Sequence, residues 1–199
     1  IYYIQTTRVN LGLFQEDINV VWDLAPHDVS IFNYILDSRP ISVSATGHSY
    51  IQPSIQDVAF VNIRYPGQVL ANIEVSWLNP NKIRKTTVVG SKKMLVYDDI
   101  SQLEKIRIYD KGVTVTPHYD SFGEFQLSYR YGDIRIPKLN GAEPLKMECQ
   151  HFVDCVEGRA EPISSGVNGL EVLLALNAAD RSMAARGAEF EIAYPKLEG

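Results

Sequence analysis

The sequence predicts an α+β domain with a large, mainly antiparallel open sheet and helices packed on one of its faces. Three observations predict it. A segment with helical periodicity follows the first strand, a block of about seven segments with the two-residue period of strands comes next, and two helical segments follow that block. The second face of the sheet then needs a cover, either another domain or another subunit.

The first elements follow from local signals. Residues 1–10 alternate like a strand and lead into a loop that contains Gly12. A helix is expected from about Leu24 to Leu36, with Asp23 as its N-cap. Pro26 would then lie in the first turn, where the missing N–H of proline is tolerated.

From residue 41 the apolar period changes to two. Strands are expected at Ile41–Tyr50, Val58–Tyr65, Val69–Leu78, Ile83–Gly90 and Met94–Tyr97. The turn signal Tyr65-Pro-Gly-Gln68 joins two of them into an antiparallel hairpin. Asn79-Pro-Asn81 predicts another turn. A second hairpin is expected between Lys105–Tyr109 and Val113–Pro117, across Asp110-Lys-Gly112.

The rest of the chain is expected to be helical after one irregular stretch. Residues 118–142 have little periodicity, with one strand near Tyr129–Ile136. The last predicted elements are helices at about Pro144–Glu157 and Gly166–Arg186 and a strand at Phe190–Tyr194. The second of these helices opens from Ser164-Ser165 and ends at Gly187.

Length and composition indicate one soluble globular domain over residues 1–199. The net charge of −5 argues against binding to nucleic acid or to anionic membranes. No apolar run approaches the ~20 residues of a membrane span. Cys149 and Cys155 are six residues apart, which suggests two reduced thiols and a cytoplasmic location. The first residue is not Met, and we expect a part of a longer protein.

Asp23 and His27 are the strongest candidates for chemistry. Four residues apart on a helix, they share one face. In a first turn, the helix dipole and a neighbouring carboxylate act on the imidazole in opposite directions, which predicts a nearly neutral histidine able to accept a proton. The alternative is that Asp23 only caps the helix and His27 only packs or is solvated.

The other polar candidates are less specific. Asp28 points away from Asp23 and is expected to be solvated, so a metal site of Asp23, His27 and Asp28 is disfavoured. Arg8, at the end of the first strand, binds an anionic group if it shares a cleft with the helix start, and otherwise faces solvent. Ordinary surface or core roles are expected for His48, His118 and His151. Trp77 and the run Lys82–Lys85 border the second half of the sheet, and this short basic run is expected to be a solvated strand edge.

Three segments in order resemble the C-terminal domain of the Gfo/Idh/MocA oxidoreductases, relatives of glucose–fructose oxidoreductase and inositol dehydrogenase. They are Trp22–Leu36 with its Asp-x-x-x-His pair, Arg84–Asp99 with its turn between two strands, and Pro144–Gly187 with Ala178-Ala-Asp-Arg-Ser182. The variant Trp-Asp-Leu-Ala-Pro-His-Asp looks closest to members that act on nucleotide sugars.

The resemblance implies the substrate-side domain of a dehydrogenase that moves a hydride between NAD or NADP and a sugar, nucleotide-sugar or cyclitol carbon. His27 would be the acid/base, Asp23 would orient it or bind a substrate hydroxyl, and Arg8 would bind phosphate or carboxylate. The cofactor would be held mainly by an N-terminal Rossmann domain. The sequence contains neither Gly-x-Gly-x-x-Gly nor Glu-Lys-Pro, so this chain alone is expected to be inactive.

Family resemblance also implies a homo-dimer or homo-tetramer formed through the open sheet face. The alternative from a different class is a non-catalytic sugar-binding or oligomerisation domain. A metal-dependent hydrolase is the least favoured reading of the same residues.

Overall fold

The computed structural model describes residues 1–115, 127–139, 141 and 143–196. His118 lies outside these residues. The elements, in chain order, are β1 (Tyr3–Leu11), α1 (Val20–Leu36), β2 (Ser42–His48), β3 (Val58–Tyr65), a short 3₁₀ turn (Pro66–Gln68), β4 (Val69–Ser76), β5 (Leu78–Val89), β6 (Met94–Asp98), β7 (Ile106–Val115), β8 (Leu127–Arg135), α2 (Pro144–Val156), α3 (Gly166–Ala184) and β9 (Phe190–Glu191).

The described strands form one sheet in the order β8-β7-β6-β5-β1-β4-β3-β2-β9. β1 runs parallel to β4, and the other neighbouring strands are antiparallel. The predicted hairpin across Tyr65–Gln68 is confirmed, with Val61 opposite Ile73. The α+β class and the mainly antiparallel sheet are therefore confirmed.

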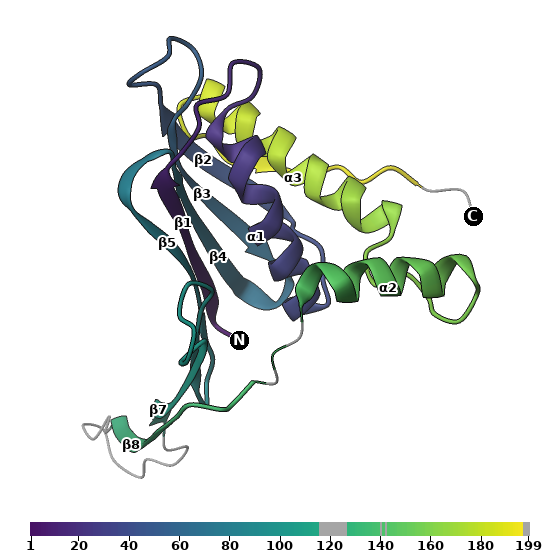
Figure 1. Cartoon of the computed structure of the whole chain (residues 1–199). Coiled ribbons are helices and arrows are strands. Elements are labelled where there is room, and N and C mark those ends of the chain that lie inside the picture. The colour runs from purple at the N-terminus through teal and green to yellow at the C-terminus, as the bar shows by residue number, and fades with distance from the viewer. Residues whose placement is uncertain (116–126, 140, 142, 197–199) are drawn as a thin grey trace.

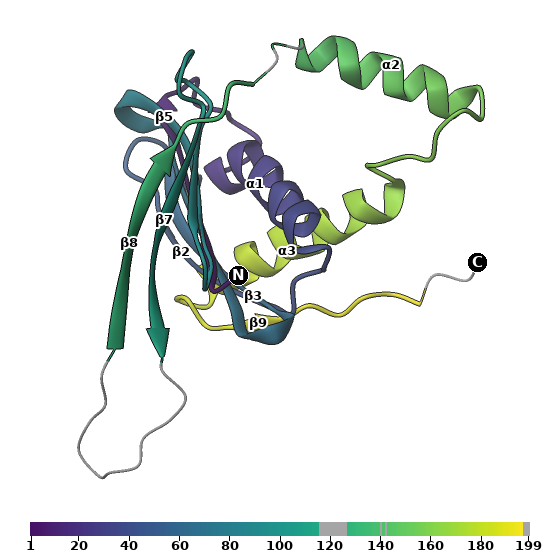
Figure 2. The same ribbon diagram turned by 90° about the horizontal axis from the view of Figure 1, so that it is seen from below.

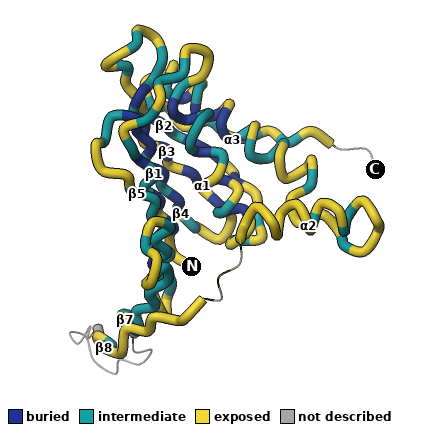
Figure 3. The backbone as a smooth tube through the Cα atoms, in the orientation of Figure 1, coloured by how far each residue is buried: buried dark blue, intermediate teal, exposed yellow. Residues whose placement is uncertain are grey.

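The three described helices lie on the same side of the sheet (Figures 1 and 2). α1 packs against β1, β3 and β4, and α3 packs against β2, β9 and α1. The buried residues concentrate between these two helices and their strands (Figure 3). β3 shows why: Ala59, Val61 and Ile63 are buried toward the helices, whereas the alternating residues Phe60 and Asn62 are exposed.

Helix α1 begins four residues earlier than the sequence predicts. Its N-cap is Asn19, whose side-chain oxygen accepts hydrogen bonds from the amides of Val21 and Trp22 at 3.0 and 3.3 Å. Both Asn19 and Asp23 suit a cap, but a start at Val20 buries two valines completely. Pro26 is therefore the seventh helical residue, and its placement in the first turn is wrong.

Two predicted turns are also wrong. Asn79–Asn81 lies inside β5, where the Asn81 amide donates to the Asn79 side chain at 2.9 Å. Asp110-Lys-Gly112 lies inside β7, which pairs with β8 and not with itself. The turn-forming residues there produce an irregularity in the strand pairing, between Tyr109 and Lys111. The turn signal in the sequence therefore marks an interruption of the ladder and not the end of a hairpin.

The C-terminal helices match their predictions closely. Ser165 caps α3 in a capping box with Asn168, and Gly187 adopts a left-handed φ of 88° just beyond the helix. The last strand, β9, is shorter than expected. Helix α2 contains no buried residue and extends away from the sheet (Figure 2). None of the described helices combines the length and apolar character needed to cross a membrane.

Candidate functional site

His27 lines a cleft between the helices and the sheet. It is the eighth residue of α1, and its side chain is exposed. The cleft has a volume of about 740 Å³, and its polar lining residues are Arg8 from β1, Arg84 from β5, and His27 and Ser30 from α1. Its apolar wall comes from Leu24, Pro26, Ile31, Val172 and Leu173.

Arg8 reaches this cleft while paired with a buried carboxylate. Its Nε and Nη2 atoms donate to the two oxygens of Asp28, each at 2.9 Å. The Asp28 side chain is 1% exposed and that of Arg8 is 14% exposed. The expectation of a solvated Asp28 is therefore wrong, because a guanidinium twenty residues away compensates its burial with two charge-assisted hydrogen bonds.

Asp23 lies close to the cleft but not in its lining. The buried indole of Trp77 donates to its Oδ2 atom at 2.8 Å. None of the hydrogen bonds between described residues joins Asp23 to His27. The helix start also lies about two turns before His27, so the partial charges of the helix N-terminus, which act within the first turn, do not reach its imidazole.

A second cavity of about 500 Å³ lies along β6 and the segment after β8. Tyr97, Lys105, Lys138 and Leu139 are among its lining residues. Tyr97 donates to Asp99 Oδ1 at 2.9 Å. Burial raises the pKa of Tyr97 to about 12, and the hydrogen bond to Asp99 adds to that shift, so this phenol is protonated at neutral pH.

Asp99 lines neither cavity but lies near a cation of each. It lies 3.8 Å from Arg84 in the first cavity and 3.8 Å from Lys105 in the second. Because both distances exceed that of a good charge-assisted hydrogen bond and all three side chains are 39–40% exposed, the two cations remain available to a ligand.

The other candidate residues lie elsewhere. His48 is at the exposed end of β2, and His151 on α2 accepts a hydrogen bond from the Ile163 amide at 3.1 Å. Cys149 and Cys155 are unpaired thiols on α2. Among the residues that the structure describes, no group of three or more His, Cys, Asp or Glu side chains could hold a metal ion.

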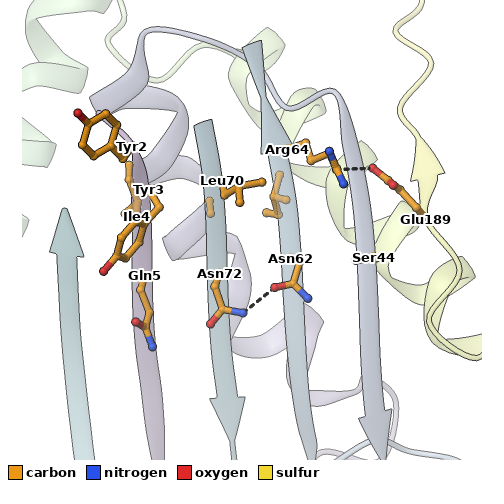
Figure 4. A pocket seen from close by; sticks show the side chains of 12 residues that line it. Tyr2, Tyr3, Ile4, Gln5, Ser44, Asn62, Arg64, Leu70, Asn72 and Glu189 are labelled. Atoms are coloured by element: carbon orange, nitrogen blue, oxygen red, sulfur yellow. Dashed lines mark hydrogen bonds and ion pairs between the residues drawn. The ribbon is translucent and has the colours of Figure 1, made fainter. Parts of the chain in front are cut away.

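The opposite sheet face carries a groove of different character (Figure 4). Tyr2, Tyr3 and Leu70 border polar side chains on four strands, β1 to β4, and the Asn72 amide donates to Asn62 at 2.9 Å. Arg64 and Glu189 form an ion pair at 2.9 Å at one side. This groove is neutral and its charges are matched, whereas the cleft beside His27 is basic.

The sequence singled out His27 and Arg8, and the structure brings both into one cleft. It missed Asp28 and Arg84. An aspartate directly after a candidate histidine looks like a solvated helix residue, and an arginine in a Lys-Ile-Arg-Lys run looks like a strand edge. Only the register that sets Arg8 opposite Arg84 reveals the second arginine as a cleft residue.

Comparison with solved structures supports the architecture. UDP-N-acetylglucosamine 3-dehydrogenase GnnA from Acidithiobacillus ferrooxidans matches with 20% identity over 92% of this chain and 55% of that chain, at a TM-score of 0.69. The WlbA dehydrogenase from Bordetella pertussis, in complex with NADH and UDP-GlcNAcA, matches with 17% identity over 98% and 55%, at 0.68. Levoglucosan dehydrogenase, in complex with NADH and L-sorbose, matches with 14% identity over 96% and 58%, at 0.71.

The chain thus spans slightly more than half the length of these structures. At such identities the likeness shows the fold. A comparison with curated proteins found no match.

Fold and cleft define the class: an open, mainly antiparallel sheet with helices on one face and a histidine-bearing basic cleft beside the first helix. Residues 15–96 match the family model described as the GFO/IDH/MocA C-terminal domain. Over these residues, the resemblance to the Gfo/Idh/MocA family that the sequence predicts is confirmed.

Proposed function

We propose that this chain is the substrate-side domain of an NAD(P)-dependent oxidoreductase that moves a hydride to or from a hydroxyl carbon of a sugar, nucleotide sugar or cyclitol. One observation carries the proposal. An exposed imidazole, His27, lines a cleft of ligand size together with Arg8, Arg84 and the hydroxyl of Ser30. Of these residues, His27, Ser30 and Arg84 lie inside the segment that matches the family.

His27 is the proposed acid/base. An imidazole nitrogen takes the proton of the substrate hydroxyl during oxidation and returns it during reduction. The exposed side chain can reach a substrate in the cleft without a rearrangement of α1. Arg8, held rigidly by Asp28, is proposed to donate to substrate oxygens with its remaining N–H groups.

For Asp23 we propose a role different from the two that the sequence suggests. The sequence suggests that it orients His27 or binds a substrate hydroxyl. Its hydrogen bond from the buried Trp77 favours a positioning role, because it ties α1 to the junction of β4 and β5 and so fixes the helix that carries His27.

NAD or NADP would be held mainly outside this chain. The sequence has no glycine-rich dinucleotide turn, and the polar lining of the cleft suits the substrate side of a shared site. When bound, the cofactor supplies the hydride acceptor or donor. The matched structures named above, two of them in complex with NADH, are more than one and a half times as long as this chain, which supports a second, cofactor-binding domain.

Two uncovered surfaces suit the proposed partners. On α2, the side chains of Leu145, Phe152 and Val156 are 65–71% exposed, and a Rossmann domain of the same polypeptide is the proposed cover. On the open sheet face, Tyr2, Tyr3, Phe60 and Leu70 are 43–59% exposed, and a second copy of the chain is the proposed cover.

The function is tested by turnover in the polypeptide that joins this chain to its dinucleotide-binding domain. His27→Ala is expected to lower kcat by about 10²–10⁴-fold, the usual contribution of a general acid/base. His48→Ala, at the exposed end of β2, is the matched control and should leave kcat unchanged.

Near-normal turnover of His27→Ala would remove the acid/base assignment. A gene without a Gly-x-Gly-x-x-Gly segment upstream of Ile1, together with a stable oligomer in sedimentation, would favour the non-catalytic sugar-binding or oligomerisation domain instead.

A further inference from the structure

Two arginines face each other across neighbouring strands at the floor of the His27 cleft. Arg8 on β1 and Arg84 on β5 are directly opposite in the antiparallel register, so their side chains leave the sheet on the same face. Like charges in this arrangement destabilise a sheet unless each has a counter-charge. Each of the two arginines therefore needs an anion nearby.

Within the described part of the chain, only one of the two arginines has a close counter-charge. Asp28 satisfies Arg8 through two hydrogen bonds of 2.9 Å. Among the described residues, the acidic side chain that pairs with Arg84 is that of Asp99, at 3.8 Å, and Lys105 lies at the same distance from that carboxylate. The sequence suggested Arg8 as the anion-binding residue, but the geometry shifts this role toward Arg84 and Lys105.

The two cavities on either side of Asp99 have a shared excess of positive charge. Arg8, Arg84, Lys105 and Lys138 line them, and none of the described lining residues carries a carboxylate. The groove on the opposite sheet face is different, because its lining includes Glu189, paired with Arg64. Asp28 and Asp99 offset two of the four cations, which leaves an excess that suits a dianionic group.

We propose that the Arg84–Asp99–Lys105 region binds the diphosphate of a nucleoside diphosphate sugar. The sugar occupies the cleft beside His27, and the nucleoside occupies the second cavity, against the ring of Tyr97 and the apolar Leu139. Arg84 donates to the phosphate nearer the sugar, whereas Lys105 and Lys138 contact the phosphate nearer the nucleoside. The hydrogen bond from Tyr97 to Asp99 holds that ring in place.

The place of the sugar rests on the proposed function, whereas the diphosphate site rests on the charges alone. The two cavities, of about 740 and 500 Å³, are each within the range of small-molecule sites. A free sugar or a cyclitol would fill only the first of them and would leave the second group of cations unused.

The test is calorimetric binding of uridine 5′-diphosphate and of uridine to this chain. We expect UDP to bind at least tenfold more tightly than uridine. Arg84→Gln and Lys105→Gln should each weaken UDP binding about tenfold, the effect of one lost charge-assisted hydrogen bond, and leave uridine binding unchanged. Lys92→Gln, in the exposed turn between β5 and β6, is the matched control and should bind UDP like the unaltered chain.

Equal binding of UDP and uridine, or UDP binding that ignores both substitutions, would overturn the proposal. So would NAD⁺ that binds more tightly than UDP and loses affinity in the same two variants, since the site would then serve the diphosphate of the cofactor. Arg84→Gln and Lys105→Gln replace half-exposed side chains, and circular dichroism checks that both variants fold. Because the readout needs no turnover, loss of UDP binding and failure of the His27 assignment are distinguishable.

Discussion

The two halves of the sheet have the same hydrogen-bonded framework but very different covers. β1, β4, β3 and β2 pack under α1 and α3, and their inward residues Ile4, Ile73 and Val75 are fully buried. β5 to β8 continue the sheet past these helices, and Tyr129, Tyr131 and Ile134 on β8 are 50–80% exposed. Stability therefore resides in the first half, and the candidate site lies where the covered half gives way to the uncovered one.

This position explains why the charges are arranged unequally. Arg8 lies on the last covered strand, where burial demands a partner, and it has Asp28. Arg84 lies one strand further out, where solvent reaches it, and its pairing with Asp99 is loose. The boundary between the covered and the solvent-exposed part of the sheet can thus present two cations to a ligand: Arg8, fixed by its ion pair, and Arg84, which remains available.

The largest expected contrast is between two phenylalanines on helices. Phe32 on α1 is completely buried, and Phe152 on α2 is 69% exposed. Phe32→Ala should lower the free energy of unfolding by about 3–5 kcal/mol through lost burial and a cavity. Phe152→Ala should change it by less than about 0.5 kcal/mol. Urea unfolding followed by circular dichroism measures both, and equal losses would contradict the comparison.

The buried ion pair should be the next most sensitive feature. Asp28→Ala leaves Arg8 without a counter-charge and should cost about 3 kcal/mol of unfolding free energy. Lys85→Ala removes one partner of the half-exposed pair with Asp98 and should cost less than about 1 kcal/mol. If the double variant Arg8→Met with Asp28→Leu is as unstable as Asp28→Ala, the loss is not due to an uncompensated charge.

A smaller loss is expected at a buried hydrogen bond between β3 and α1. The Tyr65 hydroxyl donates to Asn33 Oδ1 at 2.8 Å, and both residues are buried. Tyr65→Phe should lower the free energy of unfolding by about 1–2 kcal/mol, because the amide oxygen loses its donor without access to water. Tyr34→Phe, 74% exposed on the same helix as Asn33, is the control and should have no measurable effect.

Alkaline pH should produce the smallest effect. Burial, followed by the hydrogen bond to Asp99, raises the pKa of Tyr97 to about 12 from its ordinary 10.0. The unfolded chain releases this proton first, so the stabilisation is complete below pH 10 and is lost as pH rises from 10 toward 12. The urea midpoint of unfolding, measured at several pH values between 10 and 12, should fall less steeply with pH for Tyr97→Phe than for the unaltered chain. The same pH dependence for both proteins would contradict this assignment.

The elements that were predictable are those with local causes. Alternation in Val58–Tyr65 and Val69–Ser76, with a proline–glycine turn between them, specifies the hairpin without help from the rest of the chain. Ser165 and Asn168 specify the start of α3 in the same way. The site could be predicted in part: His27 and Arg8 were named, but Asp28 and Arg84 were misread, because solvation and strand register are not local properties.

By itself, the sequence determined the fold class, the resemblance to the family and the helix that carries His27, because periodicity, caps and motifs act over a few neighbouring residues. Tertiary structure alone decided where that helix begins, since Val20 and Val21 are buried only against the folded sheet. It also decided that Asp28 neutralises Arg8 and that Arg84 stays available. Burial and counter-charge are set by residues distant along the chain, and only the folded sheet brings them together.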